Sequence, residues 1–285
     1  MSWSQTWTYL DGDWVEGNVP LLGPRSHAMW LASTVFDGGR AFEGVAPDVA
    51  LHSARVNNSA RVMGLAPFVP VDEMLDIVEA GRKRFAPDAA LYLRPMYWAE
   101  HGGFYSVPPD PDSTRFCFCL YEAPMPPPGG FSVTLSPFRR PSNDVAPTDA
   151  KAGCLYPNGA RAITEARSRG FDNAIMLDML GNVAETATSN VFMAKDGVVV
   201  TPAANGAFLA GITRARIIGL LRADGIEVQE RAVRWLELLE ADELFSVGNY
   251  AKVAPMAQIE SRPLQPGPFF RRARELYWAF AHDGA

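Results

Sequence analysis

The sequence holds few of the residues from which disulfide frameworks and metal centres are built. Its 285 residues include only three cysteines, Cys117, Cys119 and Cys154, and four histidines. Three cysteines are too few for a disulfide framework, and neither residue type shows the spacing of metal ligands. We therefore expect no metal site and three reduced thiols, as is typical of a cytoplasmic protein.

Long apolar runs and an excess of basic residues are missing as well. No run of eighteen apolar residues occurs, so no membrane-spanning helix is expected. Residues 1–14 lack the basic and apolar regions of a secretory signal. The net charge is −6, with acidic and basic residues interspersed, which argues against nucleic acid as the main partner. These absences predict a soluble, cytoplasmic protein.

Several common catalytic motifs are also absent. The chain has no G-x-G-x-x-G after a predicted strand, no Walker A motif, no H-E-x-x-H and no G-x-S-x-G. Nothing in the sequence points to a Ser-His-Asp triad. The chemistry must therefore be sought outside the dinucleotide-binding, P-loop, zinc-protease and serine-hydrolase patterns.

One proline-rich stretch divides the chain. Residues 123–130 read "APMPPPGG", which can continue neither a helix nor a central strand and predicts a stiff linker. We expect an N-terminal domain over residues 1–122 and a C-terminal domain over residues 131–285.

Both predicted domains mix helices and strands without regular βαβ alternation, which favours an α+β fold. In the first half, the patterns predict a hairpin over residues 6–17, helices over 53–65 and 71–85, and strands over 33–42, 48–52, 90–98 and 114–122. In the second half they predict helices over 159–169, 212–224, 234–241 and 269–283, and strands over 131–138, 173–202, 226–233 and 243–248.

Lys151 is the first candidate for covalent chemistry. The chain carries only four lysines against twenty-two arginines, and only an amine that can lose its proton forms a Schiff base. Ala152 and Gly153 are small enough to leave room for a planar ring, and Tyr156 can hydrogen-bond a ring hydroxyl. Taken alone, however, a surface lysine just ahead of a helix is the favoured interpretation.

Three further features change that balance. Glu185 falls between two predicted strands, where a carboxylate can hold a pyridinium nitrogen protonated; a solvated turn acid is the alternative. Gly211-Ile212-Thr213 opens a helix without a nearby acid and suits a phosphate, or is simply a glycine-entered helix with a threonine cap. Arg55 begins a predicted helix and can bind the same phosphate with two hydrogen bonds, or is an exposed helix arginine.

The order of these motifs resembles that of the fold-type IV pyridoxal-phosphate enzymes. "KAGCLYPN", "AIMLDMLGNVAETATSNVF", "LAGITR" and "ADELFSVGN" carry the resemblance, and "SHAMWLASTVFDGGRAFEG", "HSARVNNSA" and "YLRPM" extend it over nearly the whole chain. The likeness is greatest to the branched-chain amino acid aminotransferases, with kinship to (R)-selective amine transaminases. It implies a D-amino acid aminotransferase-like fold, with an N-terminal α/β sandwich and a C-terminal pseudo-barrel.

The resemblance also assigns residue roles. Lys151 would form the Schiff base with pyridoxal 5′-phosphate and carry protons between two carbon atoms. Cofactor contacts would come from Arg55, Tyr156, Glu185, Leu209, Ile212, Thr213 and Asn249. Substrate contacts would come from Phe36, Arg40, Tyr92 and Arg94, with Leu31 and Tyr250 at positions that shape the same pocket. Residues 123–130 would close over the site of a homodimer or higher homo-oligomer.

The departures from the family pattern concern the substrate. Leu31 stands where a tyrosine is usual, and the linker offers no second tyrosine. Asn249 and Tyr250 replace a hydroxyl residue and an alanine, although Asn249 can still donate to a phosphate oxygen. A branched-chain amino acid and a 2-oxo acid remain the expected partners. The alternatives are an (R)-amine:pyruvate or D-amino acid transaminase, an aminodeoxychorismate-lyase-like eliminase, and a non-catalytic cofactor carrier.

Overall fold

A computed structural model describes residues 3–127 and 129–283. Residues 1, 2, 128, 284 and 285 lie outside the described part, and among them fall the outer limits of both predicted domains and the middle of the predicted linker. The chain divides into two compact units. The first comprises Met1–Met125 with Asp149–Leu155, and the second Pro126–Thr148 with Tyr156–Ala285. The segment that carries Lys151 therefore belongs to the first unit.

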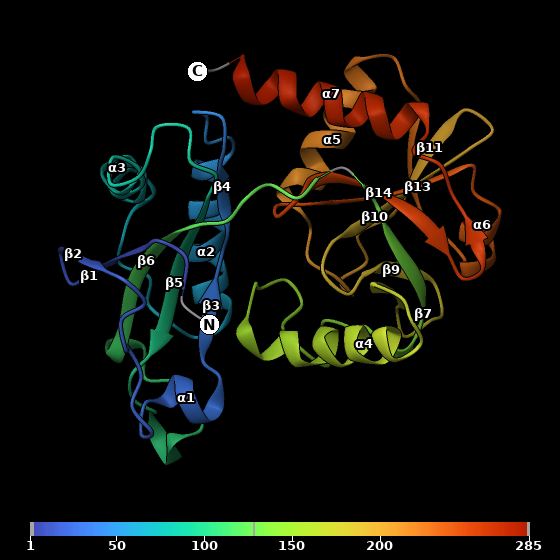
Figure 1. Cartoon of the computed structure of the whole chain (residues 1–285). Helices are drawn as coiled ribbons and strands as arrows, with labels where there is room; N and C mark the ends of the chain where they lie inside the picture. Colours follow the sequence, from blue (N-terminus) through green and yellow to red (C-terminus); the bar gives the residue numbers. More distant parts are fainter. Residues whose placement is uncertain (1–2, 128, 284–285) are drawn as a thin grey trace. The chain divides into compact units, whose positions relative to one another are not determined.

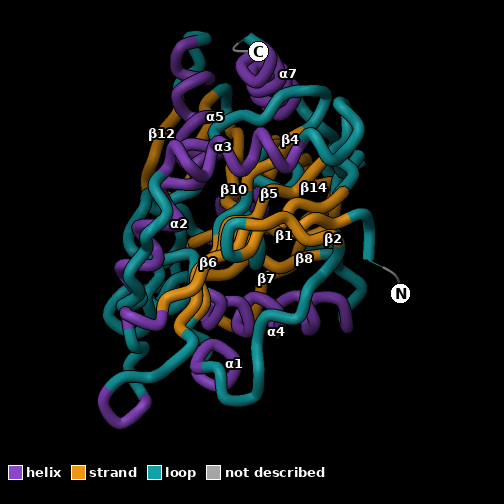
Figure 2. The backbone as a smooth tube through the Cα atoms, turned by 90° about the vertical axis from the view of Figure 1, so that its left-hand side faces the viewer, coloured by secondary structure: helices purple, strands orange, loops and turns teal. Residues whose placement is uncertain are grey.

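The first unit is built on a six-stranded sheet with the order β2-β1-β6-β5-β3, in which β4 also pairs with β5. Figure 2 draws its strands in orange, with β1, β2, β5 and β6 among those labelled. Its neighbours are antiparallel throughout. The strands are β1 (Thr6–Leu10), β2 (Asp13–Glu16), β3 (Thr34–Phe36), β4 (Gly39–Ala41), β5 (Leu91–Ala99) and β6 (Thr114–Glu122), and the helices are α1 (His27–Leu31), α2 (Val49–Val62) and α3 (Val71–Arg82).

The two faces of this sheet have different roles. Successive side chains of a strand point to opposite faces, and the odd-numbered positions of β5, such as Leu91 and Leu93, are buried in the core with α2 and α3. The even-numbered positions Tyr92 and Arg94 are only half-buried. One face of the sheet thus makes the core, and the other carries polar and aromatic side chains.

The predicted strand over residues 48–52 is wrong, because α2 already begins at Val49. The residues of α2 that are buried, including Val49, His52, Val56 and Ala60, recur every three or four positions. That helical period extends back past residue 53 and outweighs the short apolar run that suggested a strand. Arg55 therefore lies inside a helix and does not begin one. The hairpin, the second helix and the strands β5 and β6 are confirmed.

The second unit contains a nine-stranded curled sheet with the order β12-β11-β10-β13-β14-β7-β8-β9, in which β15 pairs with β14. Figure 1 shows α4 alongside β7, and α5 beside α7. The strands are β7 (Phe131–Arg139), β8 (Asn173–Leu177), β9 (Val183–Thr186), β10 (Asn190–Lys195), β11 (Val198–Pro202), β12 (Val228–Arg231), β13 (Glu243–Gly248), β14 (Lys252–Ile259) and β15 (Arg262–Pro263), and the helices are α4 (Tyr156–Ser168), α5 (Ile212–Ala223), α6 (Trp235–Glu240) and α7 (Pro268–His282).

The core of this sheet lies around β10 and β13. Phe192 and Phe245 stack with ring centroids 5.3 Å apart, and Phe270 of α7 packs beside them. On the other face, Val191, Met193 and Leu244 join a cluster with α6 residue Leu238. A sheet covered on both faces gives rigid positions for the loops at its ends.

The α+β fold class with a curled, pseudo-barrel sheet is confirmed, and the helices predicted in the second half are all present. The strand β14 and the helix α1 are among the elements that were not predicted. β14 contains Pro255, and proline is unusual inside a paired strand because it lacks an N–H donor. α1 has only five residues, too few for a helical period to be recognised.

Candidate functional site

The backbone of Lys151 is fixed on both sides by the first unit. Its N–H donates to Ser59 Oγ of α2 at 3.0 Å, and its carbonyl oxygen accepts from the N–H of Phe36 in β3 at 3.1 Å. The side chain is half-buried, with Nζ 5.0 Å from the centroid of the Phe36 ring. The amine is therefore held over an aromatic face, unlike an ordinary solvated surface lysine.

The small neighbours of Lys151 are needed for packing against β3. Ala152 is fully buried and forms an isolated β-bridge with Val35. A Cβ atom added to Gly153 would lie 2.3 Å from Thr34 Oγ1. Small residues at these two positions let the segment approach β3 closely. That they also leave room beside Lys151 for a ring stays a prediction.

Arg55 is held by a buried carboxylate that the sequence analysis did not single out. Asp37 is fully buried; it accepts from Arg55 Nε at 2.6 Å and Nη2 at 2.9 Å, and from His52 Nδ1 at 2.6 Å. Burial alone would raise the pKa of Asp37, but the charge of Arg55 and hydrogen bonds from His52 and Arg55 bring it well below its usual range. Asp37 therefore stays ionised and fixes the orientation of the guanidinium.

Four side chains gather on the open face of the first sheet. Arg94 lies 5.0 Å from the ring centroids of both Tyr92 and Tyr121 and 5.9 Å from that of Phe36. The two tyrosine rings stack at 5.4 Å, and Arg94 Nη2 donates to the Tyr121 hydroxyl. No described carboxylate pairs with Arg94, and its buried Nε lacks a hydrogen-bond partner within the described chain. A cation so placed suits an anionic ligand.

Tyr121 was not predicted as part of this group. Its position could have been inferred from the strand register, because Tyr121 faces Tyr92 directly across the pair β5–β6. That register depends on the alignment of two strands, which the sequence pattern alone does not fix.

Arg40 and Leu31 lie in different surroundings. The side chain of Arg40 is fully enclosed, and its Nη2 donates to the carbonyl oxygen of Ala123 and lies 2.9 Å from Met125 Sδ. Arg40 thus holds the start of the linker. Leu31 is the last residue of α1 and is 37% exposed.

In the second unit, Glu185 is a residue of β9 and not of a turn. Its Oε1 lies 3.1 Å from Arg140 Nε, and its Oε2 is 3.5 Å from Asn190 Nδ2. Asn190 Nδ2 also lies 3.4 Å from the carbonyl oxygen of Leu209, so it links Leu209 to the carboxylate. Glu185 is therefore a buried, held carboxylate, and the solvated-turn interpretation is wrong. Arg140 is a second residue that the sequence analysis missed.

The N-terminus of α5 is open to an anion. Gly211 occupies the N-cap position without a side-chain cap, and no acidic residue lies in the first turn. The first N–H groups of a helix have no intrahelical partner, so those of Ile212 and Thr213 can donate to a ligand. A Cβ atom at Gly211 would lie 2.1 Å from Asn190 Oδ1, which shows why glycine is needed here. The helix start predicted at 211–213 is confirmed.

The remaining predicted residues of the second unit lie at the start of a helix and in a turn between two strands. Tyr156 is the first residue of α4 and is 45% exposed. Asn249 and Tyr250 lie in the turn between β13 and β14, with Tyr250 56% exposed. They line a pocket of about 610 Å³, whose other lining residues include Gly248, Thr188 and Ser189. Asn249 Nδ2 is buried and lacks a hydrogen-bond partner within the described chain.

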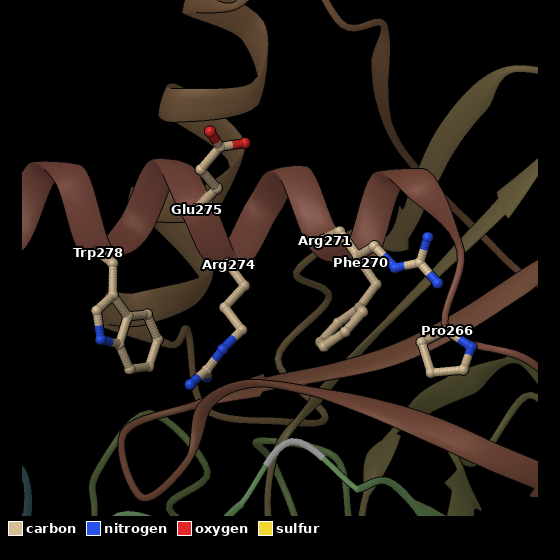
Figure 3. Close-up of a pocket in the computed structure, with 6 residues that line it drawn as sticks. All are labelled: Pro266, Phe270, Arg271, Arg274, Glu275 and Trp278. Carbon is tan, nitrogen blue, oxygen red and sulfur yellow. The ribbon is translucent and has the colours of Figure 1, made fainter.

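A second hollow lies along α7, and none of the predicted site residues lines it. Figure 3 shows the six side chains that line it, and its volume is about 510 Å³. Arg274 stacks on Trp278, with its guanidinium carbon 3.7 Å from the ring centroid. Across residues 3–127 and 129–283, no group of three or more potential ligands is placed to hold a metal ion. In the same ranges, no helix is both long and apolar enough to span a membrane.

The residues present fit a phosphorylated aromatic cofactor. Lys151 offers an amine over an aromatic ring, Glu185 offers a held carboxylate, and the start of α5 offers open N–H groups. The unpartnered Nδ2 of Asn249 is a further donor that an anionic oxygen can satisfy.

Comparisons with known proteins agree with this chemistry. Residues 34–259 match the family model of amino-transferase class IV. The branched-chain-amino-acid aminotransferase of Escherichia coli K12 is 29% identical over 283 residues, covering 95% of this chain and 91% of that protein.

Two solved structures are similar over almost the whole chain. An aminotransferase from Brucella abortus, bound to the cofactor PLP, shares 52% identity with a TM-score of 0.96, covering 98% of this chain and 99% of that one. The branched-chain aminotransferase of Thermoproteus uzoniensis, with norvaline, shares 28% identity with a TM-score of 0.89, covering 97% and 95%.

Proposed function

Because the chain belongs to the class IV aminotransferases, we propose that it moves an amino group between a branched-chain or related hydrophobic amino acid and a 2-oxo acid. The enzyme is an aminotransferase that uses pyridoxal 5′-phosphate. The observation that carries this conclusion is the family match over residues 34–259, which includes Lys151, Glu185 and the start of α5. Relatives named branched-chain aminotransferases support the substrate class.

We propose roles for the residues that hold the cofactor. Lys151 is the covalent anchor, with Tyr156 at the ring hydroxyl, Glu185 at the ring nitrogen and Leu209 against the ring. The phosphate contacts are Arg55, Ile212, Thr213 and Asn249. When bound, this cofactor supplies an electron sink for the bond-breaking step. The buried Asp37–Arg55 pair, the Arg140–Glu185 pair and the uncapped α5 support these assignments.

The residues of the chain then have distinct tasks in proton transfer. The Nζ atom of Lys151 takes a proton from the α-carbon of the amino donor and returns it at a second carbon. Glu185 keeps the proton on the ring nitrogen, and Arg140 orients the carboxylate through Oε1. The hydroxyl of Tyr156 orients the ring. A keto acid acceptor reverses the sequence, which gives a ping-pong reaction.

We propose that the first sheet supplies the substrate contacts. Arg94, held between Tyr92 and Tyr121, recognises a carboxylate, and Phe36 contacts the apolar part. Arg40 is enclosed and donates to the carbonyl oxygen of Ala123, so its contact with substrate requires release of that hydrogen bond. Leu31 and Tyr250 then shape the pocket and set the donor range.

An (R)-amine donor is the second candidate. The observation that favours it is the combination of apolar Leu31 with Asn249 and Tyr250, which alters the carboxylate side of the pocket. A panel of L-branched, L-aromatic and D-amino acids with both enantiomers of 1-phenylethylamine, each paired with pyruvate and 2-oxoglutarate, tests the assignment. Fast turnover of L-branched donors supports the first proposal, and a preference for the (R)-amine replaces it by the second. Donors that react without any acceptor would indicate a lyase.

We also propose a homodimer that works in the cytoplasm. Exposed apolar side chains gather around α1 and residues 104–107, where His27 Nε2 bonds the carbonyl oxygen of Val107; these are Met29, Trp30, Phe104, Tyr105 and Val107. Such a patch is typical of a contact between subunits. Free Cys154 is exposed, which suits a reducing compartment. Light scattering of the wild type and of Phe104→Ser tests the assembly: a dimer that dissociates in the variant supports it, and a wild-type monomer contradicts it.

A further inference from the structure

The turn between β13 and β14 contains a buried lysine in an unusual backbone conformation. Gly248 pairs with Lys252, so residues 249–251 form a three-residue connection. Lys252 closes the turn with φ at +59°, in the left-handed region that glycine or asparagine usually occupies. Its side chain is fully buried, although lysine rarely is. A long charged residue kept at such a position points to a specific task.

The side chain of Lys252 turns back onto the same turn. Its Nζ donates to Asn249 Oδ1 at 2.7 Å and lies 5.5 Å from the centroid of the buried Tyr277 ring. An ammonium group has only donors, so the atom of Asn249 that faces it must be the carbonyl oxygen. The amide is therefore fixed in one orientation, with its NH₂ group directed away from Lys252.

The NH₂ group of Asn249 is left for another partner. Asn249 Nδ2 is buried and has no hydrogen-bond partner within residues 3–127 and 129–283. A buried donor without an acceptor is unfavourable, and native structures seldom leave one. Asn249 also lines the pocket of about 610 Å³ at this end of the sheet. An oxygen atom of a ligand is the partner that this arrangement lacks.

We propose that Lys252 is a positioning residue that makes Asn249 a dedicated donor to an anionic oxygen of the ligand. The inference rests on the proposed function, which supplies two groups with such oxygens: the phosphate of the cofactor and the carboxylate of the substrate. Asn249 stands at the position where the family pattern usually has a hydroxyl residue. The Lys252–Asn249 pair supplies the hydrogen-bond donor that this hydroxyl would supply. Without the ammonium, the amide can rotate and present its own oxygen to the anion, which repels it.

A double-mutant cycle on the apoenzyme separates this role from a merely structural one. The variants are Lys252→Met, Asn249→Ala and the double variant, with binding of pyridoxal 5′-phosphate followed by absorbance. Methionine and lysine are equally disfavoured at positive φ, so the substitution Lys252→Met does not change the backbone strain of the turn. We expect each single variant to raise the Kd about tenfold and the double variant to raise it no further.

Two controls define the result. Lys195→Met removes a half-buried lysine that pairs with Asp242, and should leave the Kd unchanged. Asn249→Asp keeps the bond to Lys252 but turns the donor into an acceptor, and should bind at least as weakly as Asn249→Ala. Far-ultraviolet circular dichroism confirms that each variant is folded.

Two further arms identify the anion. Pyridoxal, which lacks the phosphate, should bind all variants alike if the phosphate is the partner. If the carboxylate is the partner, the cycle should appear instead in the Kd of a non-reacting carboxylate, 4-methylvalerate, measured on the holoenzyme. Additive losses in both arms, or no loss in either, overturn the inference. Wild-type protein that binds no pyridoxal 5′-phosphate overturns the proposed function instead.

Discussion

Arg55 and Asp37 form a two-point ion pair in the interior of the first unit. Nε lies 2.6 Å from Oδ2 and Nη2 lies 2.9 Å from Oδ1, while the carboxylate is fully buried. Asp37 directly follows β3, and Arg55 sits two turns into α2. The pair therefore joins a strand to a helix and presets the direction of a guanidinium that we assign to phosphate binding.

Replacing Asp37 by asparagine should weaken both the fold and the cofactor site. The change removes the buried carboxylate charge that pairs with Arg55, and breaking such a pair costs about 3 kcal/mol or more. Urea denaturation of the apoenzyme at pH 7 measures the loss in free energy of unfolding. A variant as stable as the wild type would show that the pair contributes little.

The same variant has a predictable pH dependence. Burial raises the pKa of Asp37, but the charge of Arg55 and the hydrogen bonds from His52 and Arg55 together lower it by more. The pKa in the folded protein is therefore below its ordinary value of 3.8. A carboxyl group whose pKa is lowered by folding stabilises the folded protein at any pH above its ordinary pKa. That stabilisation is lost as the pH falls from the ordinary pKa toward the pKa in the folded protein. The difference in unfolding free energy between wild type and Asp37→Asn should therefore stay constant from about pH 7 to 5 and shrink below about pH 4. A constant difference down to about pH 3 contradicts this.

Replacing Lys151 by alanine should abolish the covalent adduct with the cofactor. Only Lys151 of the four lysines is assigned to the imine, so borohydride reduction of the holoenzyme should label a single peptide containing it. Peptide mass spectrometry detects the label, and Lys83→Ala serves as the control because Lys83 is exposed. A label that persists in Lys151→Ala shows that another residue is the anchor.

Glu185→Gln should keep the cofactor but lose most of the proton-transfer rate. Glutamine preserves the shape of the side chain beside Arg140, yet it cannot hold a proton on the ring nitrogen by its charge. Single-turnover absorbance with an amino donor should show a rate at least about a hundredfold lower. The Kd of the cofactor, measured in parallel, separates this effect from loss of binding. Near-normal turnover rules out the electron-sink role.

Tyr121→Phe should raise the KM for the 2-oxo acid and leave kcat nearly unchanged. The variant keeps the ring that stacks on Tyr92 but removes the hydroxyl that accepts from Arg94. Losing a hydrogen bond to a charged group corresponds to roughly a tenfold rise in the KM for the 2-oxo acid. Tyr9→Phe, in the neighbouring strand β1, is the matched control. If both variants behave alike, Tyr121 does not position Arg94.

Much of the fold followed from local pattern. Apolar residues at positions 71–82 and 268–282 recur at helical spacing, and the apolar run predicted as a buried strand over 114–122 matches β6 to the residue. The patterns failed where they were short or contradictory. The short apolar run at 48–52 resembles a strand by itself, but it is the first part of the helical pattern of α2. β14 was not predicted because it contains Pro255, and proline is unusual inside a paired strand.

The candidate site was predicted unevenly for a similar reason. Lys151, Glu185 and Thr213 could be found because their sequence neighbours form recognisable motifs. Asp37 and Tyr121 could not, because each acts through a residue distant in sequence: Asp37 on Arg55, and Tyr121 on Arg94. No local pattern encodes such pairs.

The sequence by itself determined the family, the cofactor chemistry and the order of the reacting groups, because those depend on residue type and spacing along the chain. Tertiary structure decided which groups are held and by what. It placed Glu185 inside a strand beside Arg140, enclosed Arg40 at the linker, and turned Lys252 back onto Asn249. These arrangements arise from strand register and from buried charges seeking partners, and both depend on residues that meet only when the chain has folded.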